Sequence, residues 1–329
     1  MIDILPRLTE LRATPAPEKT RKVVVFVHGI VSSHATFTKL VESFESDARF
    51  DAYDLFAYDY DWGEPILTSA GKLRDILNAR VPDGSEITLI GHSMGGLVSR
   101  FALVAGNLRG VRRIVMLGAP NFGALTARQL GTLGQVAIAA AGKITPLFPR
   151  KAGLRDLTQP QTLYVQVVRN ENDDDSIPAS RALNVEYVTI PGLFYWDERR
   201  DTETGEGNEA LWFSVGGLVV KVLKAWPLSE IEIERPHDGV VEESSVNLQS
   251  TDKARLSEKN VPIRESAKYG HSYCHVVLKA MRERTHMGIQ QDPETATAIK
   301  GIMLAGSATS WNDALTFAEQ TKYIRIDIP

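Results

Sequence analysis

The feature that most constrains the fold is a Gly-His-Ser-Met-Gly run that begins at Gly91. Before it, residues 87–90 are uncharged and mostly β-branched or apolar, which is typical of a buried strand. After it, residues 96–105 repeat apolar side chains at the spacing of one helix face. A serine on such a strand-to-helix turn projects its hydroxyl away from the backbone, and Gly91 and Gly95 avoid the clashes that Cβ atoms would cause. The run therefore predicts a nucleophile at Ser93, with helix N–H groups directed at any oxyanion formed there.

The composition is typical of a globular protein and limits the classes of partner that we expect it to bind. The 329 residues suffice for one large domain, or for one domain with an insertion. A net charge of −4 gives no indication of nucleic-acid binding, and the single cysteine, Cys274, excludes an internal disulfide. No secretory signal pattern and no uncharged apolar run of 18 residues is present, so we expect a cytoplasmic protein.

Apolar stretches recur along the chain at the spacing of strands joined by helices, with a helix expected at 65–80. This alternation predicts a mostly parallel sheet with helices on both faces. Two apolar segments, 122–149 and 210–226, are expected to be helical, and each fits a buried helix or the inner face of a lid. Residues 323–328 alternate like an edge strand. The other expected strands lie at 23–27, 53–58, 87–90, 113–118 and 163–168.

The predicted domain organisation follows from these stretches. The core is expected in two parts, with an insertion around 192–228 in the second part. The parts are an N-terminal extension (1–20), the first part of the core (21–121), a lid or cap (122–160), the second part of the core (161–287) and a C-terminal extension (288–329).

Three stretches resemble segments of lipases. Val-Phe-Val-His-Gly-Ile at 25–30 resembles the oxyanion strand and loop of bacterial lipases. Gly-His-Ser-Met-Gly-Gly at 91–96 is the commonest lipase form of the nucleophile turn. Leu-Gly-Ala-Pro-Asn-Phe-Gly at 117–123 resembles a lipase strand end.

Two further stretches are similar to related groups. Tyr-Asp-Tyr-Asp-Trp at 58–62 resembles a stretch of lecithin:cholesterol acyltransferase-like proteins. Asp-Gly-Val-Val-Glu-Glu-Ser-Ser at 238–245 is similar to the acid segment of that group and of inositol-deacylase-like esterases. Over roughly residues 20–285 the chain thus resembles the lipase-like branch of the α/β-hydrolase superfamily. The resemblance implies an α/β-hydrolase fold with a lid or cap.

A serine nucleophile needs a histidine base, which in this arrangement follows the serine and the acid along the chain. His271 is the preferred base, because it follows Tyr-Gly and precedes a helix expected from residue 272 onward. His275 is the alternative, while His286, flanked by Arg, Thr and Met, is expected at the surface. His271, Cys274 and His275 lack a fourth ligand and match no zinc pattern, so no metal is expected.

The preferred acid is Asp238, because Gly239 permits a turn after a strand expected at 231–233. A carboxylate fixed by such a turn would orient the histidine. The alternative acids, Asp173, Asp174 and Asp175, follow the strand expected at 163–168.

The expected oxyanion donors are two backbone N–H groups that point at the charge developing on the substrate oxygen. Met94 directly follows the serine, and the second donor is expected within 28–30, in the loop after the strand at 23–27, where Ile30 is preferred. His28, Gly29 and His92 are expected to support the loop and the turn.

Together these residues predict a serine hydrolase that cleaves carboxylic esters, with an apolar acyl ester such as a lipid as its substrate. The chemistry needs no metal or organic cofactor. An acyltransferase that uses the same site, and a non-catalytic scaffold of the same fold, are the alternatives. Residues 122–149 would suit transient contact with a membrane surface, and would suit a buried cap equally well.

Overall fold

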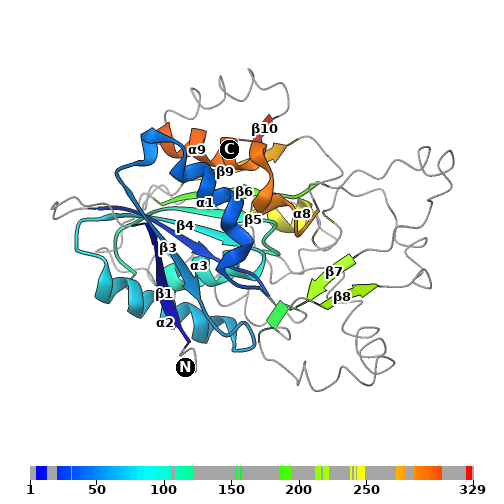
Figure 1. Cartoon of the computed structure of the whole chain (residues 1–329), viewed down its shortest axis with the longest axis horizontal. Coiled ribbons are helices and arrows are strands. Elements are labelled where there is room, and N and C mark those ends of the chain that lie inside the picture. Colours follow the sequence, from blue (N-terminus) through cyan, green and yellow to red (C-terminus); the bar gives the residue numbers. More distant parts are fainter. Residues whose placement is uncertain are drawn as a thin grey trace.

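A sheet of eight strands, in the order β1-β3-β2-β4-β5-β6-β9-β10, crosses the described part of the protein (Figure 1). The inner strands from β3 to β9 are parallel, whereas β1 and β10 pair antiparallel with β3 and β9 at the two edges. The strands are β1 (Arg7–Arg12), β2 (Lys22–Val27), β3 (Tyr53–Asp59), β4 (Glu86–His92), β5 (Val111–Leu117), β6 (Glu186–Ile190), β9 (Ser272–Leu278) and β10 (Ile324–Asp327).

The computed structural model describes fifteen separate stretches of the chain. These are residues 5–12, 21–30, 32–104, 108–121, 153, 156–157, 185–193, 212–215, 218–221, 238, 241, 243–248, 272–278, 285–305 and 324–327. Of the predicted lid at 122–160, only residues 153, 156 and 157 are described, so the lid stays a prediction. The strand expected at 163–168 lies outside the described residues.

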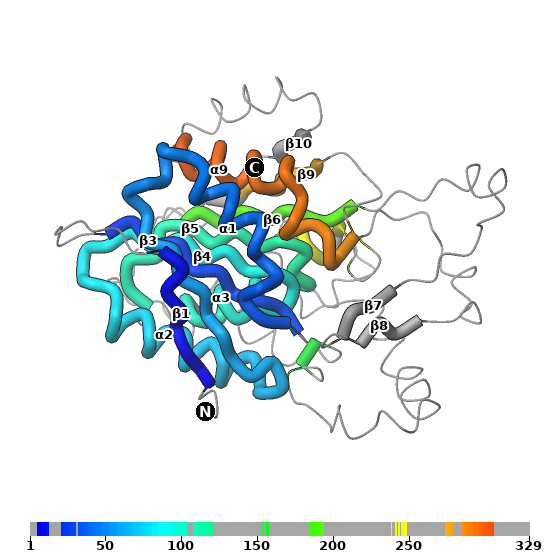
Figure 2. Tube along the Cα trace, viewed as in Figure 1, coloured from blue at the N-terminus to red at the C-terminus, as the bar shows by residue number. Residues whose placement is uncertain are grey.

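Helices cover both faces of the sheet, and the alternation of side chains along β2 explains why. Val23, Val25 and Val27 pack in one apolar cluster with α2 and α3, whereas Val24 and Phe26 pack in a second cluster with α1 and α9. Figure 2 shows α1 and α9 on one side of the strands and α2 on the other. The helices are α1 (Thr38–Glu45), α2 (Ile66–Arg80), α3 (Met94–Val104), α8 (Glu243–Val246) and α9 (Pro293–Leu304), with 3-10 turns at η1 (His34–Phe37), η2 (Ala48–Phe50) and η6 (Ile289–Gln291).

The parallel register brings three turns to one edge of the sheet. Val27, near the end of β2, lies opposite Tyr58 of β3 and Gly91 of β4. Because these strands run in the same direction, the segments that follow β2, β3 and β4 emerge side by side. This edge is where ligands bind in open α/β sheets.

The prediction of a helix at 210–226 is wrong. This segment contains an antiparallel pair of strands, β7 (Trp212–Val215) and β8 (Leu218–Lys221). The segment is apolar nearly all round, so its pattern has no clear helical period. Gly216 and Gly217 separate the two strands, and a two-residue Gly-Gly spacing is a hairpin signal.

The helix expected from residue 272 onward is also wrong, because residues 272–278 form β9 between β6 and β10. Their sequence, Ser-Tyr-Cys-His-Val-Val-Leu, is rich in the aromatic and β-branched residues that favour strands. The edge strand expected at 323–328 is present as β10.

The C-terminal extension contains a helix that the sequence analysis did not identify. The Asp292 side chain accepts a hydrogen bond from the Thr295 N–H at 2.8 Å, and Pro293 occupies the first turn of α9. Both are ordinary helix-start signals. Ile299 and its neighbours pack against the sheet, so α9 contributes to the core.

Candidate active site

Ser93 occupies the sharp turn between β4 and α3. Its φ of 53° makes it the only non-glycine residue with positive φ in the described stretches. The turn is held by the Ser93 N–H, which donates to the Leu117 carbonyl at 2.9 Å, and by the Gly96 N–H, which donates to the Ser93 carbonyl at 3.0 Å. Strained backbone of this kind persists only where the surrounding structure enforces it, and it concentrates at functional sites.

The glycines around Ser93 are required by close backbone approaches. A Cβ on Gly91 would lie 2.5 Å from the Gly95 carbonyl oxygen, and a Cβ on Gly95 would lie 2.5 Å from the His28 carbonyl oxygen. On Gly29 it would lie 2.9 Å from the Ser93 Cβ. The loop after β2 and the start of α3 therefore lie directly against the serine.

The histidine that faces Ser93 is His286, in the segment between β9 and η6. Its Nε2 atom lies 2.9 Å from Ser93 Oγ, and its Nδ1 atom lies 2.7 Å from Asp238 Oδ2. A carboxylate accepts hydrogen bonds, so Nδ1 carries the proton and Nε2 is left to accept the serine O–H. This is the geometry of a nucleophile, a general base and an orienting acid.

Asp238 is itself fixed by the backbone around it. Its Oδ1 accepts the Val241 N–H at 2.7 Å, while its backbone carbonyl accepts the His286 N–H at 2.8 Å. The acid thus holds the histidine through both a side-chain and a backbone contact. Because the Asp238 side chain is fully buried, the contact to Nδ1 is shielded from water.

Two buried residues connect this acid segment to the serine turn. Arg100 of α3 donates from Nη1 to Asn121 Oδ1 at 3.2 Å, and Asn121 donates from Nδ2 to the Val246 carbonyl of α8 at 2.8 Å. Asn121 lies in the lipase-like stretch at 117–123, and the sequence analysis assigned it no role.

The structure brings Ser93 and Asp238 together, but around a histidine that the sequence analysis expected at the surface. That expectation is wrong, because His286 is only 6% exposed. The alternative base, His275, lies buried in β9, with Nδ1 2.8 Å from Thr189 Oγ1 and Nε2 3.5 Å from Glu243 Oε1. The preferred base, His271, and the alternative acids at 173–175 lie outside the described residues.

A usable signal for His286 was present in the sequence. The base belongs in a loop that follows a strand, and 272–278 has strand composition, so the next histidine after it is His286. The polar residues directly before it, Arg-Glu-Arg-Thr, instead suggested an exposed position.

The expected oxyanion donors lie on the two segments that meet at Ser93. Met94 is the first residue of α3, so its N–H is one of those that lack an acceptor within the helix. Ile30 lies in the loop after β2 and packs partly against the core. His28 supports this loop by donating from Nδ1 to the Gly29 carbonyl at 2.8 Å, and its burial lowers its pKa.

His92 occupies the position before the nucleophile and contacts the backbone of His286. Its Nε2 atom donates to the His286 carbonyl oxygen at 2.7 Å, and the two rings are 4.9 Å apart. Burial, together with the neighbouring imidazole of His286, lowers the pKa of His92 to about 3. His92 is therefore neutral at physiological pH.

No group of three or more His, Cys, Asp or Glu side chains among the described residues could hold a metal ion. None of the helices in those stretches has the length and apolar content to cross a membrane.

Comparison with known proteins gives the family. The model of the alpha/beta hydrolase family matches residues 24–231, which is more than half of the chain. None of the curated protein sequences matches the chain.

Two solved structures share the fold. The mature lipase BlEst2 of Bacillus licheniformis is 18% identical, with a TM-score of 0.52 over 90% of this chain and 97% of that one. The phospholipase PlaB of Legionella pneumophila is also 18% identical, with a TM-score of 0.54 over 94% of this chain and 68% of that one. The sheet order, the strained serine turn and the family match together show that the chain belongs to the alpha/beta hydrolase family.

Proposed function

We propose that this hydrolase cleaves carboxylic esters through Ser93, His286 and Asp238. The observation that carries the proposal is the pair of contacts at His286, 2.9 Å to Ser93 Oγ and 2.7 Å to Asp238 Oδ2. A serine hydroxyl is a weak nucleophile at neutral pH, and a hydrogen-bonded imidazole oriented by a carboxylate makes it reactive.

The reaction proceeds in two halves. His286 Nε2 accepts the hydroxyl proton as Ser93 Oγ attacks the ester carbonyl carbon, and the oxyanion accepts hydrogen bonds from the N–H groups of Ile30 and Met94. The imidazolium then gives its proton to the leaving alcohol, which leaves an acyl group on Ser93. Water then attacks the acyl-enzyme as His286 Nε2 accepts one of its protons, and the imidazolium returns that proton to Ser93 Oγ as the acid leaves. Asp238 keeps its hydrogen bond to Nδ1 and stabilises the imidazolium that forms in each half.

We propose an apolar acyl ester, such as a lipid, as the substrate. Support comes from the lipase-like stretches at 25–30, 91–96 and 117–123, and from the two solved relatives described as a lipase and a phospholipase.

The test is hydrolysis of p-nitrophenyl esters from acetate to palmitate by the wild type and by Ser93→Ala. We expect turnover that rises with acyl length and is lost in the variant, and labelling of Ser93 by a fluorophosphonate probe. Activity confined to short chains would restrict the substrate to small esters. Hydrolysis that persists in Ser93→Ala would refute the mechanism.

A further inference from the structure

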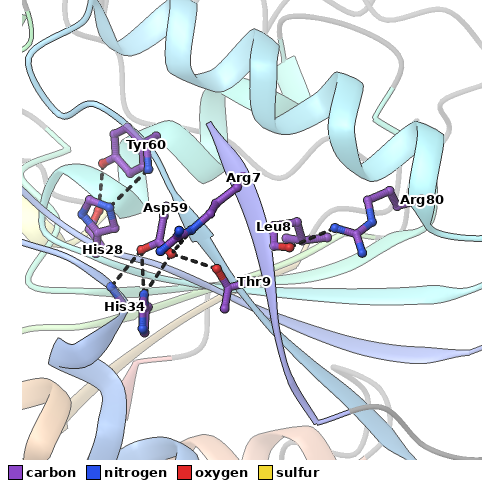
Figure 3. A network of polar contacts seen from close by, with 8 residues as sticks. All are labelled: Arg7, Leu8, Thr9, His28, His34, Asp59, Tyr60 and Arg80. Atoms are coloured by element: carbon purple, nitrogen blue, oxygen red, sulfur yellow. Dashed lines mark hydrogen bonds and ion pairs between the residues drawn. The ribbon is translucent and has the colours of Figure 1, made fainter. Parts of the chain in front are cut away.

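A single buried carboxylate, Asp59, accepts hydrogen bonds from two segments that are distant in the sequence (Figure 3). Asp59 is the last residue of β3 and is 4% exposed. Its Oδ1 accepts the His34 backbone N–H at 3.1 Å, and His34 Nδ1 lies 2.9 Å from each carboxylate oxygen. From β1, Thr9 Oγ1 and Arg7 Nε donate to Oδ2 at 3.0 and 3.3 Å.

The next residue, Tyr60, contacts His28, which lies at the start of the loop after β2. Its hydroxyl donates to the His28 carbonyl at 2.8 Å, and its ring stacks on the His28 ring at 4.5 Å between centroids. Burial raises the pKa of Tyr60 well above its ordinary value, so the hydroxyl remains a donor. Asp59 therefore contacts His34 and Tyr60 contacts His28, on either side in sequence of the expected oxyanion donor Ile30.

The Asp59 carboxylate is suited to this contact because it is ionised. Burial pushes its pKa upward, but hydrogen bonds from His34 and Thr9 act in the opposite direction and leave the pKa below its usual value. Charge-assisted hydrogen bonds are shorter and stronger than neutral ones. The carboxylate therefore holds His34 more firmly than a neutral amide would.

β1 supplies the other half of the environment of Asp59. Arg7 lies opposite Asp59 in the antiparallel ladder, and Thr9, two residues along, is on the same face of the strand. The position of β1 is also secured by Arg80 of α2, which donates to the Leu8 carbonyl at 2.9 Å (Figure 3).

We propose that Asp59 is a positioning residue for the reaction, which acts through His34 to set the position of the Ile30 N–H relative to Ser93. This inference rests on the proposed serine hydrolase function. An oxyanion donor acts on the transition state rather than on bound substrate, and a misplacement of about 1 Å can cost about 10²-fold in rate. Loss of the Asp59–His34 contact should therefore lower kcat and leave KM nearly unchanged.

The experiment compares Asp59→Asn, His34→Ala and His34→Asn in the full-length protein. Each is assayed with the best p-nitrophenyl ester and with the matching thionoester, whose sulfur accepts hydrogen bonds poorly. Rates are expressed per Ser93 labelled by fluorophosphonate, so that unfolded molecules do not count. Arg80→Gln is the matched control, because it removes an anchor of β1 without touching Asp59.

We expect Asp59→Asn and His34→Ala to lower kcat by about 10- to 100-fold, with KM within about twofold, because a displaced oxyanion donor loses part of its effect. The wild-type preference for the oxygen ester over the thionoester should shrink in both. His34→Asn, whose amide nitrogen replaces Nδ1, should recover most of the rate, and Arg80→Gln should match the wild type.

The outcomes separate this inference from the proposed function. His34 is the informative position if Asp59→Asn does not fold, because its side chain is 35% exposed and tolerates change more easily. A full rate per labelled serine and an unchanged oxygen-to-sulfur preference in His34→Ala would overturn the positioning role and leave Ser93 chemistry intact. Ester hydrolysis that survives in Ser93→Ala would overturn both.

Discussion

The side chain of His92 donates a hydrogen bond to the backbone carbonyl of His286, with 2.7 Å between Nε2 and the oxygen. The residue directly before the nucleophile thus holds the backbone of the histidine whose ring faces that nucleophile. Because burial and the neighbouring His286 lower the pKa of His92, the donor is a neutral imidazole. The serine turn and the base are therefore tied together twice, once through Ser93 Oγ and once through His92.

Replacing His92 should impair catalysis according to whether a donor remains. His92→Leu leaves the His286 carbonyl without this donor, at a cost of about 1–3 kcal/mol for a buried group, and frees the base to shift. We expect kcat/KM for ester hydrolysis to fall by about tenfold or more, since each 1.4 kcal/mol is one factor of ten. His92→Gln, whose Nε2 reaches about as far, should stay within a few-fold of the wild type. Equal rates in the two variants would contradict this role.

The low pKa of His92 also makes the fold sensitive to acid. An unfolded histidine takes up a proton near pH 6.5, whereas folded His92 resists protonation down to about pH 3. The unfolded state therefore binds more protons in this window. His92 leaves the free energy of unfolding unchanged above pH 6.5 and lowers it progressively below that pH.

We expect this residue to lower the free energy of unfolding by up to ~1.4 kcal/mol for each pH unit below 6.5, until about pH 3. Urea unfolding between pH 7.5 and pH 4 measures the slope. His92→Gln cannot titrate, so its slope should be shallower than that of the wild type, and parallel slopes would argue against the assignment.

Gly118 packs against the contact between the acid and the base. Its φ is +55°, and a Cβ there would lie 3.0 Å from Asp238 Oδ2 and 3.3 Å from His286 Nδ1. Gly118→Ala should therefore disturb this hydrogen bond, with a loss of about 10- to 100-fold in kcat. The unfavourable backbone should cost about 1–2 kcal/mol of stability.

A matched control for Gly118 lies in α2. A Cβ on Gly71 would meet only Arg74 Nη2, at 3.9 Å. Gly71→Ala should raise the free energy of unfolding by roughly 0.5–1 kcal/mol through helix propensity and leave kcat unchanged. If Gly118→Ala were as active as Gly71→Ala, the tight packing at the acid would have no catalytic importance.

The identity of the base is decided by single substitutions of three histidines. His286→Ala should lower kcat for ester hydrolysis by at least about 10⁴-fold, because the serine loses its proton acceptor. His275→Ala removes a buried contact to Thr189 and should reduce thermal stability while keeping the rate within a few-fold. Loss of turnover in His271→Ala, with His286→Ala still active, would restore the assignment made from sequence.

The central strands and the serine turn could be predicted because their sequences permit few alternatives. Val23 to Val27 is entirely apolar, as a strand covered on both faces must be, and β2 is buried along this whole stretch. The Gly91–Gly95 run has a fixed spacing because the backbone of α3 approaches β2 too closely for a Cβ atom. Local sequence determines both features.

The proposed base was indicated by the sequence only indirectly, through the strand composition of 272–278, because its position depends on contacts distant in sequence. His286 is buried by Asp238 and Ser93, which lie 48 and 193 positions away, and its own neighbours are polar. Because a helix was expected from residue 272 onward, the loop that carries the base was expected just before it. This favoured His271. The Asp59 network is equally distant, since Arg7 and His34 come from segments 52 and 25 positions away.

The separation of 193 positions between Ser93 and His286 also orders events during synthesis. The serine turn and the loop after β2 emerge from the ribosome early, whereas His286, the proposed proton acceptor, follows only after β9. A nascent chain that stops before residue 286 would carry Ser93 without its proposed base. If the proposed mechanism holds, hydrolysis begins only when the late segment packs against the early one, and unfinished chains are inactive.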